Sequence, residues 1–182
     1  LAFDKGVFEE LLVKSSFDFS DIQKNLAFLK GYKTEGNISS QDITEAIPKS
    51  LQDNIFDMTQ LLLRGQIQDV RELVHDLRLQ GEDEIKLIAV MLGQFRTYLQ
   101  VKLLSAQGKS EQQIVSSLSD YLSRKVNPFQ VRYAIRDSRH LSVAFLKTTI
   151  KTLVETDYQI KTGTLDKDYL FDLALLKIVS NR

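Results

Sequence analysis

The sequence predicts an all-α protein in which a small three-helix module is followed by a larger helical bundle. Apolar residues recur three or four positions apart over long stretches, which is the spacing of one face of an α-helix. The clearest stripe comprises Ile85, Ile88, Ala89, Leu92, Phe95, Leu99 and Leu103. Only two Pro and eight Gly occur in 182 residues, so long uninterrupted helices are favoured. Because no alternation of period two lasts more than a few residues, we expect no sheet.

The break between the two parts is expected near Pro48, which separates residues 1–48 from residues 49–182. The first part contains three short helical patterns, which extend over 3–14, 20–32 and 40–47. A module of this size buries little apolar surface alone, so we expect it to be stabilised by packing against neighbouring parts of the protein. The second part brings the expected total to about nine or ten helices joined by short loops, the pattern of a packed bundle.

Several residues mark where the predicted helices begin and end. Four glycines follow apolar stretches, where a left-handed C-terminal cap favours a residue without Cβ: Gly65, Gly81, Gly108 and Gly163. Ser110 and Gln113 have the spacing of a capping box, and Pro128 suits the first turn of a helix that starts near Asn127. Asp166 is a suitable N-cap for the final helix. That helix is apolar almost all round from Tyr169 to Val179, which predicts a place inside the bundle.

The composition bears on which partners the protein can bind and on the compartment in which it is found. Lys plus Arg equals Asp plus Glu at 24 each, so the net charge gives no prior for nucleic acid or a membrane surface. The chain has no Cys, which excludes disulfides and favours a reducing compartment; we expect the cytoplasm. No apolar run approaches the roughly 20 residues that span a bilayer, and we expect no membrane partner. The first residues lack both a signal-peptide layout and an initiator Met, so we expect a piece of a longer chain.

No group of residues predicts catalysis, a cofactor or a metal ion. The two histidines, His75 and His140, stand 65 positions apart, and neither has a second ligand at helical spacing together with a carboxylate on the same side. Residues 108–110 match the end of a phosphate-binding loop, but position 103 is Leu rather than Gly and the segment follows a helix. The carboxylates at 82–84 precede an apolar stripe, so we interpret them as acidic residues in a first helical turn.

Arg132, Arg136 and Arg139 are spaced four and three apart, which predicts one basic helical face, with Arg124 and Lys125 shortly before it. Such a face can be solvated, can contact acidic groups of a partner subunit, or can contact DNA phosphates. We find no aromatic residue interleaved as a stacking platform, which disfavours single-strand binding.

The order of short motifs carries the interpretation further. In chain order they are IFD at 55–57, RG at 64–65, LQGEDE at 79–84, LGQFR at 92–96, VKLL at 101–104, GKSEQQI at 108–114, NPFQV at 127–131, ETD at 155–157 and KTG at 161–163, before a Leu-rich final helix. Together they resemble the C-terminal helical domain of bacterial DNA polymerase III delta subunits. The resemblance runs from Ile55 to the end and more faintly through Ile38–Ile43. Asn25 and Phe28 depart from the family pattern, where an acidic residue and a Lys are usual.

The resemblance implies a non-catalytic subunit of the clamp loader in DNA replication. Residues 1–48 would be part of a small lid-like middle domain, and residues 49–182 a collar domain that assembles with other loader subunits. The sliding clamp would be contacted only through an N-terminal domain absent from this chain. Any polymerase activity, a nucleotidyltransferase reaction, would belong to the holoenzyme.

We expect partner contacts on the exposed side of the helix from Asn127 to Arg139 and on the last two helices. The candidate residues are Asn127, Phe129, Arg132, Arg136, Arg139, Asp157 and Lys161. The alternative function is a helical nucleic-acid-binding domain that uses Arg132, Arg136 and Arg139, although we expect any DNA contact to be indirect. A helical enzyme with an unrecognised site is the third and weakest alternative.

Overall fold

The computed structural model describes residues 1–15, 18–163 and 165–182. The chain forms two compact units, Leu1–Asn54 and Ile55–Arg182. The all-α fold class is confirmed, with ten helices in the described residues. The division lies in the first turn of a helix, a few residues beyond the boundary expected near Pro48.

The N-terminal unit contains α1 (Val7–Lys14), α2 (Phe19–Tyr32) and α3 (Ser40–Ala46). Two short strands, β1 (Ala2–Phe3) and β2 (Asn37–Ile38), pair in parallel. The expectation of no sheet is therefore wrong at this one place, because a two-residue strand is too short to show an alternating pattern. For the same reason the first helix begins at Val7 rather than at residue 3, since Ala2 and Phe3 belong to the strand.

Local hydrogen bonds define the helices of this unit. The side chain of Asp18 caps α2 by accepting the N–H groups of Ser20 and Asp21. Ser39 and Asp42 form a capping box at the start of α3. The helices enclose a small apolar core of Val7, Leu11, Leu29, Ile38, Ile43, Ala46 and Ile47.

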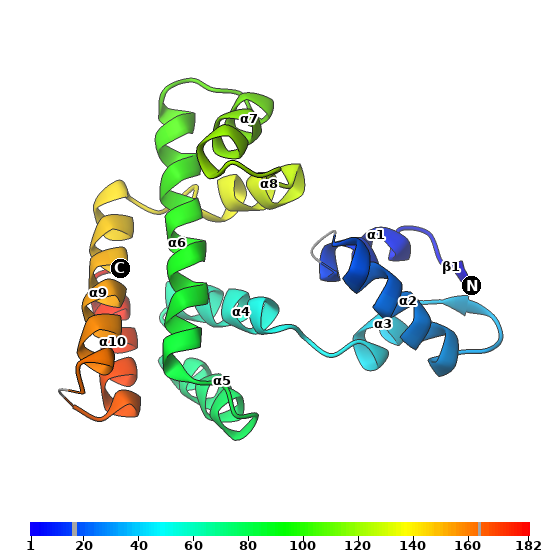
Figure 1. The fold of residues 1–182 in the computed structure, drawn as a ribbon, viewed down its shortest axis with the longest axis horizontal. Coiled ribbons are helices and arrows are strands. Elements are labelled where there is room, and N and C mark those ends of the chain that lie inside the picture. The colour runs from blue at the N-terminus through cyan, green and yellow to red at the C-terminus, as the bar shows by residue number, and fades with distance from the viewer. Residues whose placement is uncertain (16–17, 164) are drawn as a thin grey trace. The chain divides into compact units, whose positions relative to one another are not determined.

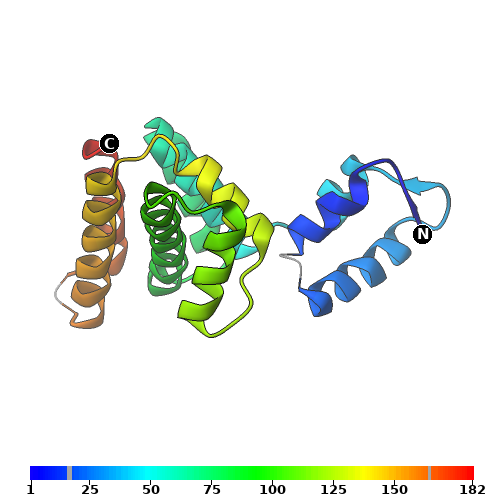
Figure 2. The ribbon, with the colours of Figure 1, turned by 90° about the horizontal axis from the view of Figure 1, so that it is seen from above.

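The C-terminal unit is a bundle of seven helices in the described residues. They are α4 (Leu51–Arg64), α5 (Ile67–Leu79), α6 (Glu84–Ala106), α7 (Glu111–Leu122), α8 (Pro128–Asp137), α9 (Val143–Lys161) and α10 (Lys167–Ser180). The long helix α6 runs through the middle of the unit, with α9 and α10 on one side and α7 and α8 on the other (Figures 1 and 2). Lying between two layers, α6 must bury more than one narrow stripe.

The buried face of α6 is broader than the predicted apolar stripe, and its centre is rotated around the helix axis relative to that stripe. Ile88, Leu92 and Phe95 are buried as expected, together with other residues such as Leu87, Met91, Tyr98 and Val101. Ala89 and Leu103 are exposed, so these two members of the predicted stripe are wrong. A second helical layer covers positions that a one-sided stripe would leave in water.

Helix α10 differs from its prediction in a way that matters for function. Its buried residues are Leu170, Phe171, Ala174, Leu175 and Ile178. Tyr169 and Leu176 are 57% and 49% exposed, so the helix lies at the outside of the unit rather than within it (Figure 1). The apolar residues on its outer side therefore have no cover within the described part of this unit.

The capping residues that the sequence predicts are confirmed. Ser110 and Gln113 form a capping box, and the side chain of Asp166 accepts the N–H of Tyr169. All four predicted glycines have positive φ, as a left-handed cap requires: Gly65, Gly81, Gly108 and Gly163. A Cβ at Gly65 would also lie 2.5 Å from Nη1 of Arg182, whose guanidinium donates to the carbonyl of Leu63.

The central position of α6 predicts the cost of truncating its core. We expect Phe95→Ala to lower the free energy of unfolding by roughly 3–5 kcal/mol, because the ring is fully buried and leaves a cavity. Tyr121→Ala, at a residue that is 74% exposed, should cost under about 0.5 kcal/mol. Urea unfolding followed by circular dichroism measures both, and equal losses would contradict this description of the core.

The N-terminal unit predicts a dependence of stability on pH. Hydrogen bonds from Lys33 and from Ser39 lower the pKa of the Asp42 carboxyl to about 2, from an ordinary value of 3.8. A carboxyl with a depressed folded-state pKa stabilises the fold above its unfolded-state pKa and loses that contribution as the pH falls. We therefore expect wild type to lose stability between about pH 4 and pH 2 more steeply than Asp42→Asn.

Thermal melts across this pH range measure the difference. Glu35→Gln, at an exposed residue in the connector before β2, serves as the control. A pH profile of Asp42→Asn that coincides with that of wild type would rule out the contribution of this carboxyl.

Candidate interaction surfaces

The first surface surrounds α8, where the sequence predicts most of the partner contacts. The side chain of Asn127 caps the helix by accepting the N–H of Phe129 at 2.9 Å, and Pro128 occupies the first turn as predicted. Val131 and Ala134 are buried and face the bundle. The opposite side of α8 is consequently exposed.

The arginines of α8 already have partners within the chain. The guanidinium of Arg132 lies 3.0 Å from the Glu111 carboxylate and over the ring of Phe129, 5.6 Å from its centroid. Arg136 pairs with Asp137 at 2.7 Å and lies 5.0 Å from the centroid of the Tyr133 ring. The prediction that no aromatic is interleaved with these arginines is therefore wrong, since a spacing of three residues places each ring beside its arginine. Part of the positive charge is already neutralised before any partner binds.

Arg139 does not belong to the predicted helical face. Helix α8 ends at Asp137, and the buried hydroxyl of Ser138 donates to the Ala134 carbonyl at 2.6 Å. The carbonyls of Ser138 and Arg139 accept hydrogen bonds from Nζ of Lys102 on α6, at 3.2 and 3.1 Å. Lys102 thus supplies the cation that favours a helix C-terminus, and sequence reasoning missed it because it comes from another helix.

Asp157 and Lys161 form an ion pair one turn apart on α9, with 2.7 Å between Oδ2 and Nζ. They lie near the C-terminal end of α9, away from α8 on the other side of α6 (Figure 1). The structure thus brings Asn127, Phe129, Arg132 and Arg136 together and separates them from the α9 pair. The predicted contact residues therefore lie on at least two separate parts of the surface.

A group of charged residues joins α5, α6 and α10, and we call it the Arg78 cluster. Its members are Arg78, Asp83, Glu84, Lys167, Asp168 and Asp172. Nε of Arg78 on α5 donates to Glu84 at 2.8 Å, and Nη2 donates to Asp172 on α10 at 3.0 Å. Glu84 is only 2% exposed. One guanidinium therefore links three helices around a buried carboxylate.

The carboxylates at 82–84 do lie at the start of α6, where Asp83 caps the helix by accepting the N–H of Ile85. Lys167 adds a second cation, 2.7 Å from Asp83 and 3.3 Å from Glu84. Burial raises the pKa of Glu84, but the hydrogen bonds, foremost that from Arg78, outweigh it and the net pKa lies below its usual value. Burial and the nearby Glu84 raise the pKa of Asp168. The cluster therefore favours the charged form of Glu84, as an ion-pair anchor requires.

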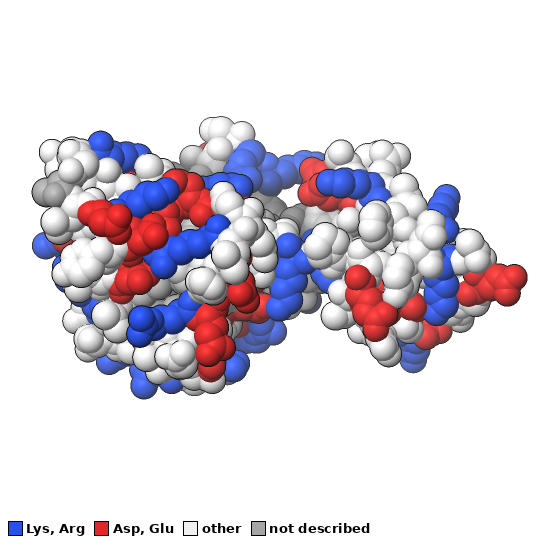
Figure 3. Space-filling view, turned by 90° about the horizontal axis from the view of Figure 1, so that it is seen from below, with Lys and Arg blue, Asp and Glu red and all other residues white. Residues whose placement is uncertain are grey.

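The remaining motifs have structural roles. Lys109, in the segment that resembles a phosphate-binding loop, lies between α6 and α7 and donates to Ser117 at 2.7 Å. His75 and His140 are exposed, and among the described residues no three His, Cys, Asp or Glu side chains are placed so that they could hold a metal ion. No helix in the described ranges is long and apolar enough to cross a membrane. On the face of the C-terminal unit that Figure 3 shows, acidic and basic side chains lie beside one another.

Comparison with known proteins gives concordant matches. The family model described as DNA polymerase III delta subunit, C-terminal domain, matches residues 52–178. DNA polymerase III subunit delta of Bacillus subtilis (strain 168) is 34% identical over 161 residues, which are 88% of this chain and 44% of that protein. The solved Bacillus subtilis DNA clamp loader delta protein matches with a TM-score of 0.83 and 31% identity, over 94% of this chain and 49% of that one. The chain thus spans about half the length of these relatives, and the resemblance inferred from the motifs is confirmed.

From the Arg78 cluster we expect a single substitution to destabilise the protein more than a double substitution that removes both partners of the buried ion pair. We expect Arg78→Met to lower the free energy of unfolding by roughly 3 kcal/mol. The substitution leaves the buried Glu84 carboxylate with Lys167 as its one remaining cation partner. Adding Glu84→Leu should recover most of that loss, since an apolar pair replaces the buried charges. Urea unfolding measures the free energy of unfolding of wild type, of Arg78→Met and of the double variant.

The control is Lys86→Met, which removes an exposed ion pair with Glu82 and should cost under about 0.5 kcal/mol. A double variant that is less stable than Arg78→Met would show that Glu84 acts through something other than its pairing with Arg78.

Proposed function

Because this chain belongs to the family of DNA polymerase III delta subunits, matching its C-terminal domain, we propose that it is an assembly module of the bacterial clamp loader. In this role it binds neighbouring loader subunits through the C-terminal unit and performs no chemistry of its own. The observation that carries the proposal is the family match over residues 52–178, which covers nearly the whole of the unit Ile55–Arg182.

The physical character of the surface supports an assembly role. Large apolar side chains are exposed on several helices of the C-terminal unit, among them Tyr121, Tyr158, Tyr169 and Leu176. Exposed apolar area of this kind is typical of protein interfaces. The carboxyl and guanidinium groups of the Arg78 cluster are engaged in pairs that stabilise the fold, which supports a structural role for them.

The role of the full-length protein extends beyond this chain. We propose that contact with the sliding clamp is made by the half of the protein that lies outside the sequence described, and that the protein acts in the cytoplasm. We also propose that the α8 residues Asn127, Phe129, Arg132 and Arg136, with Arg139 beyond the helix end, contact one partner. The Asp157–Lys161 pair of α9 would contact a second partner, since it lies on another side of the unit.

A mixing experiment tests the proposal. The chain is combined with the other clamp-loader subunits of the same organism, and the mass of the complex is read by light scattering after size exclusion. We expect a stoichiometric complex that survives moderate salt, because apolar contacts are screened little by ions.

The opposite outcome would favour the nucleic-acid alternative. If no complex forms and the chain is instead retained on primed DNA in a salt-sensitive way, the arginines near α8 would be phosphate contacts. Retention should then weaken steeply as salt rises, because each neutralised phosphate releases a counterion.

A further inference from the structure

The outer side of α10 is apolar although nothing within the described unit covers it. Most surface helices have a polar outer face, whereas α10 presents Tyr169, Leu173 and Leu176 there. Leu173 is half-buried, and the other two are exposed by 57% and 49%. Exposed apolar side chains that share one helix face are typical of a contact surface.

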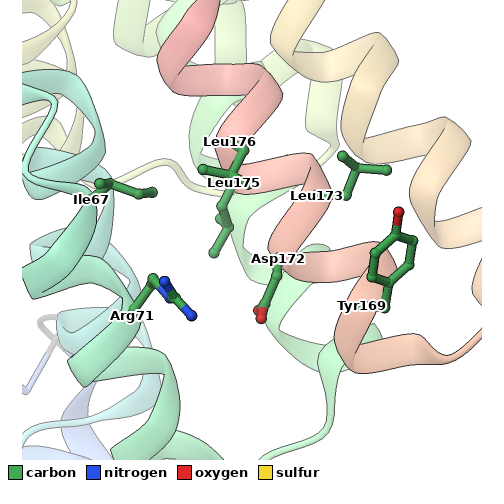
Figure 4. Close-up of a pocket in the computed structure, with 7 residues that line it drawn as sticks. All are labelled: Ile67, Arg71, Tyr169, Asp172, Leu173, Leu175 and Leu176. Atoms are coloured by element: carbon green, nitrogen blue, oxygen red, sulfur yellow. The ribbon is translucent and has the colours of Figure 1, made fainter.

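These residues form one wall of a groove between α5 and α10. The cavity measures about 300 Å³ and is bounded on the α5 side by Ile67 and Arg71. The α10 side contributes Tyr169, Leu173 and Leu176, as well as Asp172 (Figure 4). Its lining is therefore mainly aliphatic and aromatic, with one cation and one carboxylate facing it from opposite helices.

The two charges in the groove are not equivalent. The Asp172 carboxylate already accepts a hydrogen bond from Arg78 at 3.0 Å, as part of the Arg78 cluster. Arg71 has no hydrogen bond or ion pair with any residue that the structure describes. The groove consequently offers apolar surface beside one cation whose guanidinium is available to a ligand. A guanidinium binds carboxylates strongly because its two N–H groups match the two carboxylate oxygens.

We propose that this groove binds an amphipathic α-helix from a neighbouring clamp-loader subunit. Apolar side chains of that helix, spaced three or four residues apart, enter between Ile67 and Leu176, and a carboxylate beside them pairs with Arg71. The inference rests on the proposed assembly function and specifies the surface and the chemistry of the partner. It adds a contact on α5 and α10 to those on α8 and α9.

Charge argues against a second copy of this chain as the occupant. A second copy of this chain would bring the same surface to itself, and its one available cation would meet no available carboxylate there. An amphipathic helix with one carboxylate beside its apolar face matches both the apolar wall and Arg71.

The test uses the full-length protein with the other loader subunits of the same organism. Leu176→Glu places a charge on the apolar wall, and Arg71→Glu reverses the cation. We expect each variant to raise the dissociation constant at least about tenfold, with no change in the thermal midpoint of the protein alone. Matched controls lie on α6, away from the groove: Leu103→Glu, at a residue 41% exposed, and Arg96→Glu, at another exposed residue of the same helix. These controls should bind like wild type.

The outcomes separate this inference from the proposed function. If wild type forms no complex, the assembly function itself fails. If wild type binds and both groove variants bind equally well, the function stands and the groove is not the contact. Two further results would overturn the proposed occupant: a dimer of the protein alone that Leu176→Glu abolishes, or flotation with phosphatidylglycerol vesicles that the same substitution abolishes.

Discussion

The buried ion pair between Glu84 and Arg78 organises the half of the C-terminal unit that contains α5, α6 and α10. Glu84 begins α6 and is almost inaccessible to water, so its charge must be compensated within the protein. Arg78 provides this compensation and also holds Asp172 on α10. Since a guanidinium donates in fixed directions, the pairs define how α10 lies against α5. The apolar groove between these two helices is a consequence of that placement.

Helix α6 gives the unit its second organising feature. It is the longest helix in the described residues and has other helices on both sides (Figure 1). Its broad buried face separates α7 and α8 from α9 and α10, so the exposed residues of the two layers face different directions. The two layers therefore present two separate exposed surfaces, which the proposed assembly with two neighbours requires, because a heterologous interface uses unlike patches.

The distribution of charge favours protein partners over nucleic acid. Positive and negative residues are equal in number, and they lie beside one another on the face of the C-terminal unit that Figure 3 shows. Arg132 and Arg136 lie beside carboxylates of the same chain, and each is also stacked on a ring. Such arginines contribute less to phosphate binding than free ones, because part of their charge is already neutralised. They remain suitable for a protein interface, where arginines stacked on aromatic rings are common.

The sequence by itself determined most of the helices, the caps that begin or end them, and the family. Ser110, Pro128 and Asp166 mark helix starts because capping depends on residues within one turn, and the glycines mark helix ends for the same reason. Only the tertiary structure decided which side of α10 is covered, that Lys102 caps α8, and that Arg78 neutralises Glu84 and reaches Asp172. These contacts join residues far apart in the chain, up to 94 positions for Arg78 and Asp172. The periodicity of a helix shows which residues share a face, whereas the partner of that face depends on how all the helices pack together.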